Sequence, residues 1–324
     1  MWRPDVVLYH DPCFDGFGAA VAAWKRWGSD CAYFGIQYGD EPPVVDGKRV
    51  LMVDFSLKRD AMEALAARAD SIVVLDHHKT AEAELAAFPR LEHLSVDAVE
   101  FSDTPPAEPM LGASNVLVYF DMEKSGAVLT WEFCSRAPVP PLLKSIQDRD
   151  LWRFEYDSTR AVHMAPQTYD QTFDVWDGLL DRRTELTAVG IPVLQYHNRM
   201  LERLSTKARR IWWPTRKEDG AQAYNMSLDG AFPEHEDPAQ YIAAVVINAP
   251  PVLASDLGHL LVQQYPASAD MAIVWSGNME DVFVSLRSGD GGADVSEVAR
   301  LWGGGGHRNA AGFKCGRSEF PILC

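Results

Sequence analysis

Residues of metal-ligating type stand in four short groups in the first half of the chain. The groups are His10, Cys13 and Asp15; Asp54; Asp76, His77 and His78; and Asp148 and Asp150. Carboxylates and imidazoles with little sulfur suit Mn²⁺ or Mg²⁺, with Zn²⁺ or Fe²⁺ as alternatives. Several such ligands can hold two ions about 3.5–4 Å apart with one bridging carboxylate, an arrangement that stabilises the attacking and leaving oxygens of a phosphoryl displacement.

Each group taken alone has a simpler explanation. An Asp that follows a strand commonly forms a turn or caps a helix, and adjacent histidines are more often a surface pair than a ligand pair. A metal site is favoured over these simpler roles only if the fold brings the groups together. The secondary-structure elements that carry the groups therefore decide between the two explanations.

The first part of the chain alternates strand and helix signals. Short apolar runs predict strands at 6–9, 31–36, 50–53 and 71–75, and helix-compatible stretches lie between them at 16–27 and 58–69. Such alternation is typical of an α/β domain with a parallel sheet covered on both faces. Ligands bind at the carboxyl ends of the strands in these sheets, and the first three polar groups each follow a strand there.

The remainder of the chain predicts a connecting helix and a second, smaller α/β domain. Residues 97–112 are acidic and Pro-rich and predict a loop, 125–133 predicts a helix, and 155–185 has no clear period. Apolar residues at helical spacing predict a long helix over 186–211, with Pro192 in its first turns and Pro214 after its end. The tail predicts a strand at 243–247, a helix at 255–264, a hairpin from 271–275 and 282–286, and a helix at 295–302 that runs into four glycines.

Composition limits the classes of function. The chain has 324 residues, which suggests two domains, and a net charge of −16, which disfavours bulk binding of long duplex DNA. It has no run of 18 apolar residues, so no membrane association is expected, and the first apolar run is too short for a secretory signal. Five widely spaced cysteines without a CxxC pair favour a reducing cytoplasm.

Basic and aromatic residues are interleaved over 199–217, where seven Lys or Arg side chains flank Trp212 and Trp213. Such a pattern can form a track for single-stranded nucleic acid. We favour the solvated face of a helix with the tryptophans packed on a neighbouring element.

Two motifs resemble those of the DHH phosphoesterase superfamily. The name-giving triplet stands as Asp76-His77-His78, and residues 304–312 read GGGHRNAAG, which is similar to the GGGHxxAAG signature of the DHH-associated C-terminal domain. The resemblance implies a catalytic domain over 1–185, a connecting helix over 186–215 and a substrate-binding domain over 216–324, with a cleft between the domains. The C-terminal motif points to the nuclease and phosphodiesterase branch rather than to the pyrophosphatases.

The resemblance also implies a role for each motif residue. His10 matches a ligand of the first metal, Asp15 and His77 match ligands of the second, and Asp54 matches the bridging carboxylate. Asp76 would orient His77, and His78 would face the substrate phosphate. Asp148 matches the aspartate of the fourth motif best, with Asp150 as the competing choice.

One position departs from the pattern of the family. The first motif usually carries an aspartate where this chain has Cys13. A thiolate there could ligate a softer metal, or the first site could be weaker or vacant, and Asp11 is a further substitute.

The glycine run has its own chemistry. Successive backbone amides of Gly304, Gly305 and Gly306 can form an anion-binding nest, to which His307 and Arg308 add charged donors. The resemblance suggests that Arg287 also contacts a phosphate or nucleotide. A flexible turn and a solvated surface arginine are the simpler alternatives.

These observations predict a metal-dependent phosphohydrolase that cleaves the phosphodiester bonds of short oligonucleotides or dinucleotides, such as a 3′-5′ exonuclease or oligoribonuclease. The expected cofactor is a pair of Mn²⁺ ions, with Mg²⁺, Co²⁺ or Zn²⁺ as alternatives. A 3′,5′-bisphosphate nucleotide phosphatase, an exopolyphosphatase and a catalytically weak nucleotide-binding protein stay open. A cytoplasmic location is expected, and a homodimer is an open alternative.

Overall fold

The computed structural model describes residues 2–37, 40–101, 115–215, 222–226, 232, 237–266 and 269–322. The chain divides into two compact units, Met1–Gln195 and Tyr196–Cys324. Each unit contains a sheet with helices on both faces, and the division falls within one long helix, α8 (Arg183–Ser205). The α/β fold class predicted from the sequence is therefore confirmed.

The sheet of the first unit is parallel throughout its described strands and has the order β2-β1-β3-β4-β5. The strands are β1 (Val6–His10), β2 (Ala32–Ile36), β3 (Arg49–Val53), β4 (Ser71–Asp76) and β5 (Val116–Phe120). The helices before α8 are α1 (Phe14–Trp27), α2 (Arg59–Ala66), α3 (Lys79–Glu84), α4 (Gly126–Cys134), α5 (Pro141–Asp150), α6 (Thr159–Met164) and α7 (Phe173–Leu179).

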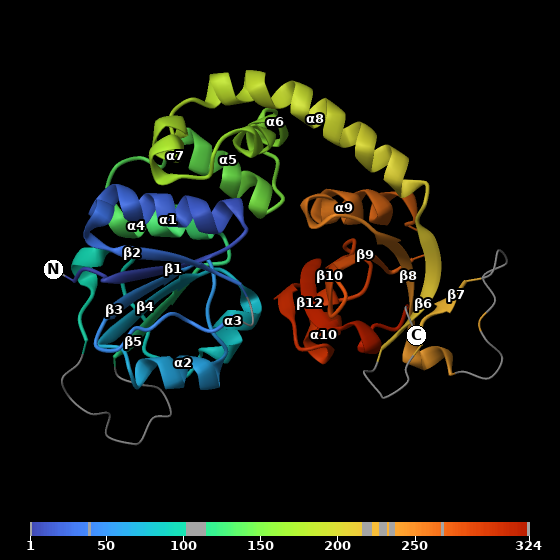
Figure 1. Ribbon diagram of the computed structural model, residues 1–324, viewed down its shortest axis with the longest axis horizontal. Helices are drawn as coiled ribbons and strands as arrows, with labels where there is room; N and C mark the ends of the chain where they lie inside the picture. The colour runs from blue at the N-terminus through green and yellow to red at the C-terminus, as the bar shows by residue number, and fades with distance from the viewer. Residues whose placement is uncertain are drawn as a thin grey trace. The chain divides into compact units, whose positions relative to one another are not determined.

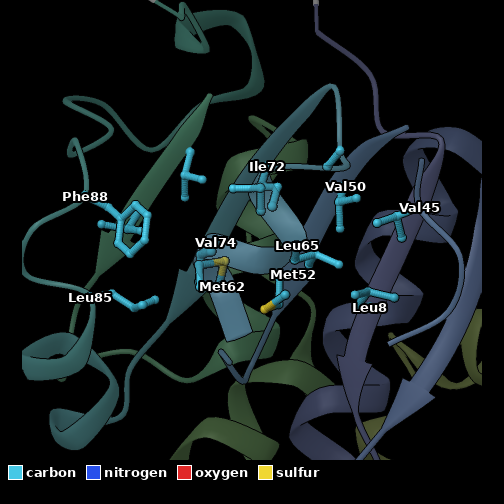
Figure 2. Close-up of a cluster of buried hydrophobic side chains, with 14 of the residues drawn as sticks. Leu8, Val45, Val50, Met52, Met62, Leu65, Ile72, Val74, Leu85 and Phe88 are labelled. Atoms are coloured by element: carbon cyan, nitrogen blue, oxygen red, sulfur yellow. The ribbon is translucent and has the colours of Figure 1, made fainter. Parts of the chain in front are cut away.

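Both faces of this sheet are buried, which explains why its strands are continuous apolar runs. Alternate residues of β1 show the division: Leu8 belongs to the core under α2, whereas Val7 packs with α1 on the other face. Figure 2 shows the first of these cores, where Met62 and Leu65 of α2 lie against side chains from the central strands. Helices α1 and α4 cover the opposite face of the sheet (Figure 1).

A second helical layer packs outside α1 and α4. Residues from α5, α6 and α7 join it, among them the fully buried Trp176, which packs edge-on against Phe17 of α1. The sequence showed no clear period over 155–185, where α6 and α7 lie. These helices are six and seven residues long, too short to display a periodic pattern.

The sheet of the second unit is mixed, with the order β11-β12-β10-β9-β8-β6-β7 among the described residues. The strands are β6 (Arg209–Pro214), β7 (Tyr224–Asn225), β8 (Tyr241–Asn248), β9 (Met271–Gly277), β10 (Asp281–Arg287), β11 (Gly305–His307) and β12 (Ala310–Gly316). Helix α9 (Ala254–Gln264) covers one face and α10 (Val295–Leu301) the other (Figure 1).

The predicted helix over 186–211 is wrong at its C-terminal end. Helix α8 stops at Ser205, and residues 209–214 form strand β6, which pairs with β8. The physical reason is the burial of alternate residues: Ile211 and Trp213 face the core, and Trp213 packs against Trp302 and Phe320. The basic residues at 209 and 210 therefore lie on a strand rather than on a helix face, and residues 216 and 217 fall outside the described part.

Most of the predicted acidic loop, residues 102–112, also falls outside the described part of the chain. Among the described helices, none has the length and apolar character needed to cross a membrane.

Candidate metal centre

Polar side chains from three neighbouring strands meet at the carboxyl edge of the first sheet. His10 is the last residue of β1, Asp54 follows β3, and Asp76 ends β4 just before His77 and His78. The parallel register pairs Tyr9 with Val53 and Val53 with Leu75, so the three strand ends lie at one level. This convergence is the arrangement that parallel α/β sheets use for ligand binding.

The His77 imidazole lies at the centre of the cluster. Its Nε2 atom is 3.1 Å from Oδ1 of Asp54, 3.6 Å from Oδ2 of Asp15 and 3.7 Å from Oδ2 of Asp150. His77, Asp15 and Asp54 are each at most 2% exposed, so these charges are almost completely removed from water. Three carboxylates around one buried imidazole are a donor set that a divalent cation can share.

His10 and Cys13 extend the cluster on the other side of Asp54. Nδ1 of His10 is 3.6 Å from Oδ2 of Asp54. Three overlapping triads each bring one donor atom per residue within 4.8 Å of the others: His10, Cys13 and Asp54; Asp54, His77 and His78; and Asp15, His77 and Asp150. Asp54 and His77 each belong to two triads, and Asp54 joins the His10 side to the His77 side, as a bridging ligand would.

Asp15 is held by the start of helix α4. Its two carboxylate oxygens accept hydrogen bonds from the backbone N–H groups of Gly126 (2.6 Å) and Ala127 (3.1 Å). A helix N-terminus carries partial positive charge and unpaired N–H groups, so it stabilises a carboxylate there. The start of α4 thus fixes the orientation of the Asp15 carboxylate, which lies more than a hundred residues earlier in the chain.

Asp54 itself has a left-handed backbone conformation, with φ of 60°. Asp and Asn adopt this region more readily than other non-glycine residues, although at some cost. The turn directs the carboxylate back over the sheet edge towards His10 and His77.

Asp76 contacts both histidines of the triplet, but in different ways. Its Oδ1 accepts hydrogen bonds from the His77 and His78 backbone N–H groups (2.7 and 3.3 Å) and lies 2.7 Å from Nδ1 of His78. The ring that Asp76 orients is therefore that of His78, and not that of His77 as predicted from the motif. Asp76 is fully buried, and the positive charge and hydrogen bond of His78 outweigh its burial and lower its pKa.

The two candidate aspartates of the fourth motif lie in different surroundings. Asp148 accepts hydrogen bonds from the backbone N–H of Glu155 (2.8 Å) and Tyr156 (3.3 Å) and from the hydroxyl of Thr159. Asp150, at the end of α5, faces His77 instead. The geometry therefore favours Asp150, the competing choice, over Asp148 as a ligand, because the Asp148 carboxylate is occupied in holding the loop before α6.

The loop after Asp150 carries a stack of cations and aromatic rings that was not predicted from the sequence. The guanidinium carbon of Arg149 is 4.1 Å from the centre of the Trp152 ring, and that of Arg160 is 3.9 Å from the centre of the Phe154 ring. Trp152 and Phe154 both have positive φ, near 55°, and their rings pack edge-on. The alternation of Arg and aromatic residues over 149–160 was the available signal, but only the left-handed turns bring the rings together.

The electrostatics of the cluster favour added positive charge. Burial and the neighbouring Asp54 and Asp150 carboxylates raise the pKa of Asp15, and partial desolvation and the Asp54 carboxylate raise that of Asp150. Burial alone would raise the pKa of Asp54, but the neighbouring His10 and His77 rings lower it. Oδ2 of Asp54 is buried and has no hydrogen-bonding partner among the described residues. The cluster thus contains carboxylates that repel one another and a buried oxygen that lacks a donor. A divalent cation would offset both unfavourable effects.

The predicted substrate-binding residues gather in the second unit. Gly305, Gly306 and His307 form β11, which pairs with β12, and Arg287 ends β10 on the other side of β12. Glycine is required here: a Cβ on Gly304 would lie 2.0 Å from the carbonyl oxygen of Gly312, and Gly306 has a φ of 141°. Arg308 donates a hydrogen bond to the carbonyl of Gly292.

Comparisons with known proteins give distant relatives. No family model matches the chain. An uncharacterized protein of Acanthamoeba polyphaga mimivirus is 29% identical over 334 residues, which cover 95% of this chain and 66% of that protein. The chain thus spans just under two thirds of the length of that relative.

Three solved structures are similar in part. The DHH domain of a member of a family of ribosomal proteins aligns over 98% of this chain and 83% of its own, with 15% identity and a TM-score of 0.46. A pGpG-specific phosphodiesterase from Vibrio cholerae aligns over 98% and 95%, with 12% identity and a TM-score of 0.41. An exopolyphosphatase-related protein from Bacteroides fragilis aligns over 96% and 87%, with 13% identity and a TM-score of 0.40. At these identities and scores, the likenesses do not by themselves assign an activity to the chain.

Proposed function

We propose that the protein is a metal-dependent phosphoesterase of the DHH type that hydrolyses short oligonucleotides or dinucleotides. The observation that carries the proposal is the convergence of Asp15, Asp54 and Asp150 on Nε2 of His77 at the carboxyl edge of a parallel sheet. The triplet Asp76-His77-His78 and the glycine motif at 304–312 support it.

The proposed ligands divide between two ions that share Asp54. His10, Cys13 and Asp54 would hold one ion, and Asp15, Asp54, His77 and Asp150 the other; Mn²⁺ is the favoured ion because oxygen and imidazole donors predominate. When bound, such ions supply Lewis acidity, which lowers the pKa of water and neutralises charge on phosphate oxygens.

Asp76 and His78 have a separate role in the proposal. Asp76 holds Nδ1 of His78 at 2.7 Å and so fixes the ring, which is only partly buried. Because Nδ1 faces Asp76, Nε2 is the ring nitrogen that would face a non-bridging phosphate oxygen, and an N–H group there would stabilise the charge that develops on that oxygen. In the overall reaction, the oxygen of water bonds to phosphorus, the bond to the ribose 3′ oxygen breaks, and that oxygen leaves as a hydroxyl group.

The second unit would capture the substrate phosphate. The glycine-rich backbone at 304–306 permits a close approach, and His307, Arg308 and Arg287 would provide hydrogen-bond donors. A local basic site on a chain with a net charge of −16 favours short substrates over long nucleic acids.

Hydrolysis of a 5′-phosphorylated diadenylate in the presence of Mn²⁺ tests the proposal. We expect mononucleotides as products with the wild type, and a loss of turnover of more than about 100-fold in Asp54→Asn, since even residues that only support a ligand contribute 10- to 100-fold. Asparagine is chosen because it tolerates the left-handed conformation at this position.

A matched control and alternative substrates complete the experiment. Asp60→Asn changes an exposed aspartate of α2 outside the cluster and should leave turnover unchanged. Near-normal turnover in Asp54→Asn would refute the bridging role. Parallel assays with adenosine 3′,5′-bisphosphate and polyphosphate separate a phosphodiesterase from a nucleotide phosphatase or an exopolyphosphatase. If the protein bound nucleotide but hydrolysed none of these substrates, it would be a nucleotide-binding protein without phosphoesterase activity.

A further inference from the structure

The face of the second sheet that α9 packs against carries three successive rows of paired residues. Residues paired across strands share a face, and rows two residues apart along a strand lie about 7 Å from one another. The rows are His307, Ala310 and Arg287; Gly305, Gly312 and Ser285; and Lys314, Phe283 and Ser276.

Helix α9 identifies this face and covers only part of it. A Cβ on Gly258 of α9 would lie 2.8 Å from Cγ of Arg287, so the helix passes directly over the stem of that side chain. Leu257 and Leu261 of α9 pack on β8 and β9. Towards β12 the face is partly exposed, and its exposed residues are Phe283 and Lys314 of the third row.

Phe283 is the unusual residue of the third row. It lies in β10, between β9 and β12, yet its side chain is 43% exposed, whereas Val282 and Val284 on the opposite face are buried. Nζ of Lys314 lies 5.5 Å from the centre of the Phe283 ring and 2.9 Å from Oδ2 of Asp281. A flat ring with a neighbouring ammonium group is thus accessible on this face.

The middle row lies between the Phe283 ring and the row of Arg287 and His307, and its own side chains are small. Gly305 and Gly312 have none, and Ser285 has only a hydroxyl, which accepts a hydrogen bond from Nη1 of Arg287. The three rows therefore form a strip with Arg287 and His307 at one end and the Phe283 ring at the other. In the middle row, the Arg287 guanidinium reaches over Ser285, and the two glycines leave the backbone beside it bare.

We propose that Phe283 is a stacking platform for a nucleobase of the substrate, with the sugar over the glycine row and the phosphate at Arg287 and His307. This proposal rests on the proposed function, because the phosphate end of the strip is the predicted substrate-binding motif. The order phosphate, sugar and base matches the order cation, bare backbone and aromatic ring, and every base offers a face for stacking. Lys314 would add a donor at the edge of the base.

The proposal selects one substrate class among the alternatives. A nucleotide covers the Phe283 ring, whereas a polyphosphate chain has no group to place there. The strip therefore favours nucleotide substrates over inorganic polyphosphate.

Calorimetric binding of adenosine 5′-monophosphate and ribose 5-phosphate to the full chain tests the platform. The wild type should bind the nucleotide more tightly than the sugar phosphate. Phe283→Leu, which keeps an apolar side chain but removes the ring, should weaken nucleotide binding by roughly 5- to 100-fold and leave ribose 5-phosphate unchanged. Phe283→Trp should restore nucleotide binding.

Leu301→Ala is the matched control, because Leu301 is an exposed apolar residue of α10, on the opposite face of the same sheet. Equal binding of the two ligands by the wild type, or nucleotide binding by Phe283→Leu equal to that of the wild type, would overturn the platform. Diadenylate hydrolysis that persists in that case would leave the proposed function standing. If Phe283→Leu instead abolished self-association in sedimentation and left nucleotide binding intact, the face would belong to a second copy of the chain, and the base-binding proposal would be wrong.

Discussion

Gly126 and Asp54 lie so close together that no side chain fits between them. A Cβ on Gly126 would be 2.4 Å from Cβ of Asp54 and 2.6 Å from its Oδ1. The same glycine donates its N–H to Asp15. One residue at the start of α4 therefore sets the positions of two carboxylates of the proposed metal centre.

Gly126→Ala should displace Asp54 and weaken metal binding. Because the added methyl group meets a buried side chain on rigid backbone, we expect a loss of about 1–3 kcal/mol in the free energy of unfolding. Mn²⁺ affinity should fall by at least about 10-fold. Urea denaturation and calorimetric titration with Mn²⁺ measure the two effects.

Gly178→Ala is the control for this change. A Cβ on Gly178 of α7 meets no atom within 4 Å, so this variant should keep its Mn²⁺ affinity and change the stability by no more than about 1 kcal/mol. Equal behaviour of the two variants would contradict the steric argument.

The two aspartates of the fourth motif should respond in opposite ways. Asp148→Asn replaces one of two buried accepting oxygens with an NH2 group, which faces N–H or hydroxyl donors and cannot accept from them, so the free energy of unfolding should fall by about 2–4 kcal/mol. Asp150→Asn should leave stability unchanged or slightly higher, because it removes a negative charge near Asp15 and Asp54, but it should reduce Mn²⁺ affinity by about 10-fold or more. If Asp148→Asn alone reduced metal affinity at full stability, the assignment would be reversed.

The pair of Asp5 and Arg49 should make stability depend on acid pH. Two side-chain hydrogen bonds and one backbone hydrogen bond from Arg49 lower the pKa of Asp5 from 3.8 to about 2. Since the folded state binds this proton less readily than the unfolded chain, the contribution is complete above pH 4 and is lost as the pH falls towards 2. The groups are about a third exposed, so we expect about 1–2 kcal/mol.

Urea denaturation of wild type and Asp5→Asn over a pH series isolates this contribution from those of other carboxylates. The difference in the free energy of unfolding should be largest near pH 6 and should shrink steadily below pH 4. A difference that stayed constant down to pH 2 would show that the ion pair does not stabilise the fold.

Cys13 should determine which metal the first site prefers. Burial and the nearby Asp54, Asp150 and Asp15 carboxylates raise the pKa of its thiol well above the usual value, so the metal-free protein keeps the proton on sulfur. A soft ion displaces that proton more readily than a hard one. Cys13→Asp should therefore lower Zn²⁺ affinity and raise Mn²⁺ affinity, each by about 10-fold. Unchanged affinities for both ions would place the sulfur outside the ligand set.

The parallel sheet and its ligand-bearing edge could be predicted from the sequence because both depend on local patterns. The apolar runs before His10, Asp54 and Asp76 are short, continuous and buried on both faces, and each polar group directly follows its strand. The end of α8 could not be predicted in this way. Residues 206–211 fit a helical period as well as a strand, and the burial of Trp213 against Phe320, over a hundred residues away, decided between them.

The details of the site depend on contacts between distant parts of the chain. The support of Asp15 by Gly126 and Ala127 joins residues 111 and 112 positions apart, and no local pattern indicates it. The choice between Asp148 and Asp150 is similarly non-local. Both residues end the same helix, two positions apart, and only the turn through Trp152 and Phe154 brings the N–H groups of the following loop to Asp148.

The stacking of Arg149 on Trp152 gives the first unit an optical signal next to its proposed metal centre. Trp152 is two residues from Asp150, and the centre of its ring lies 4.1 Å from the guanidinium carbon of Arg149, the residue that precedes Asp150 in the chain. An ion that drew Asp150 inwards would change the surroundings of the indole, and hence its fluorescence. Metal loading could then be followed in the unmodified protein, without a substrate and without knowing which phosphate ester it cleaves.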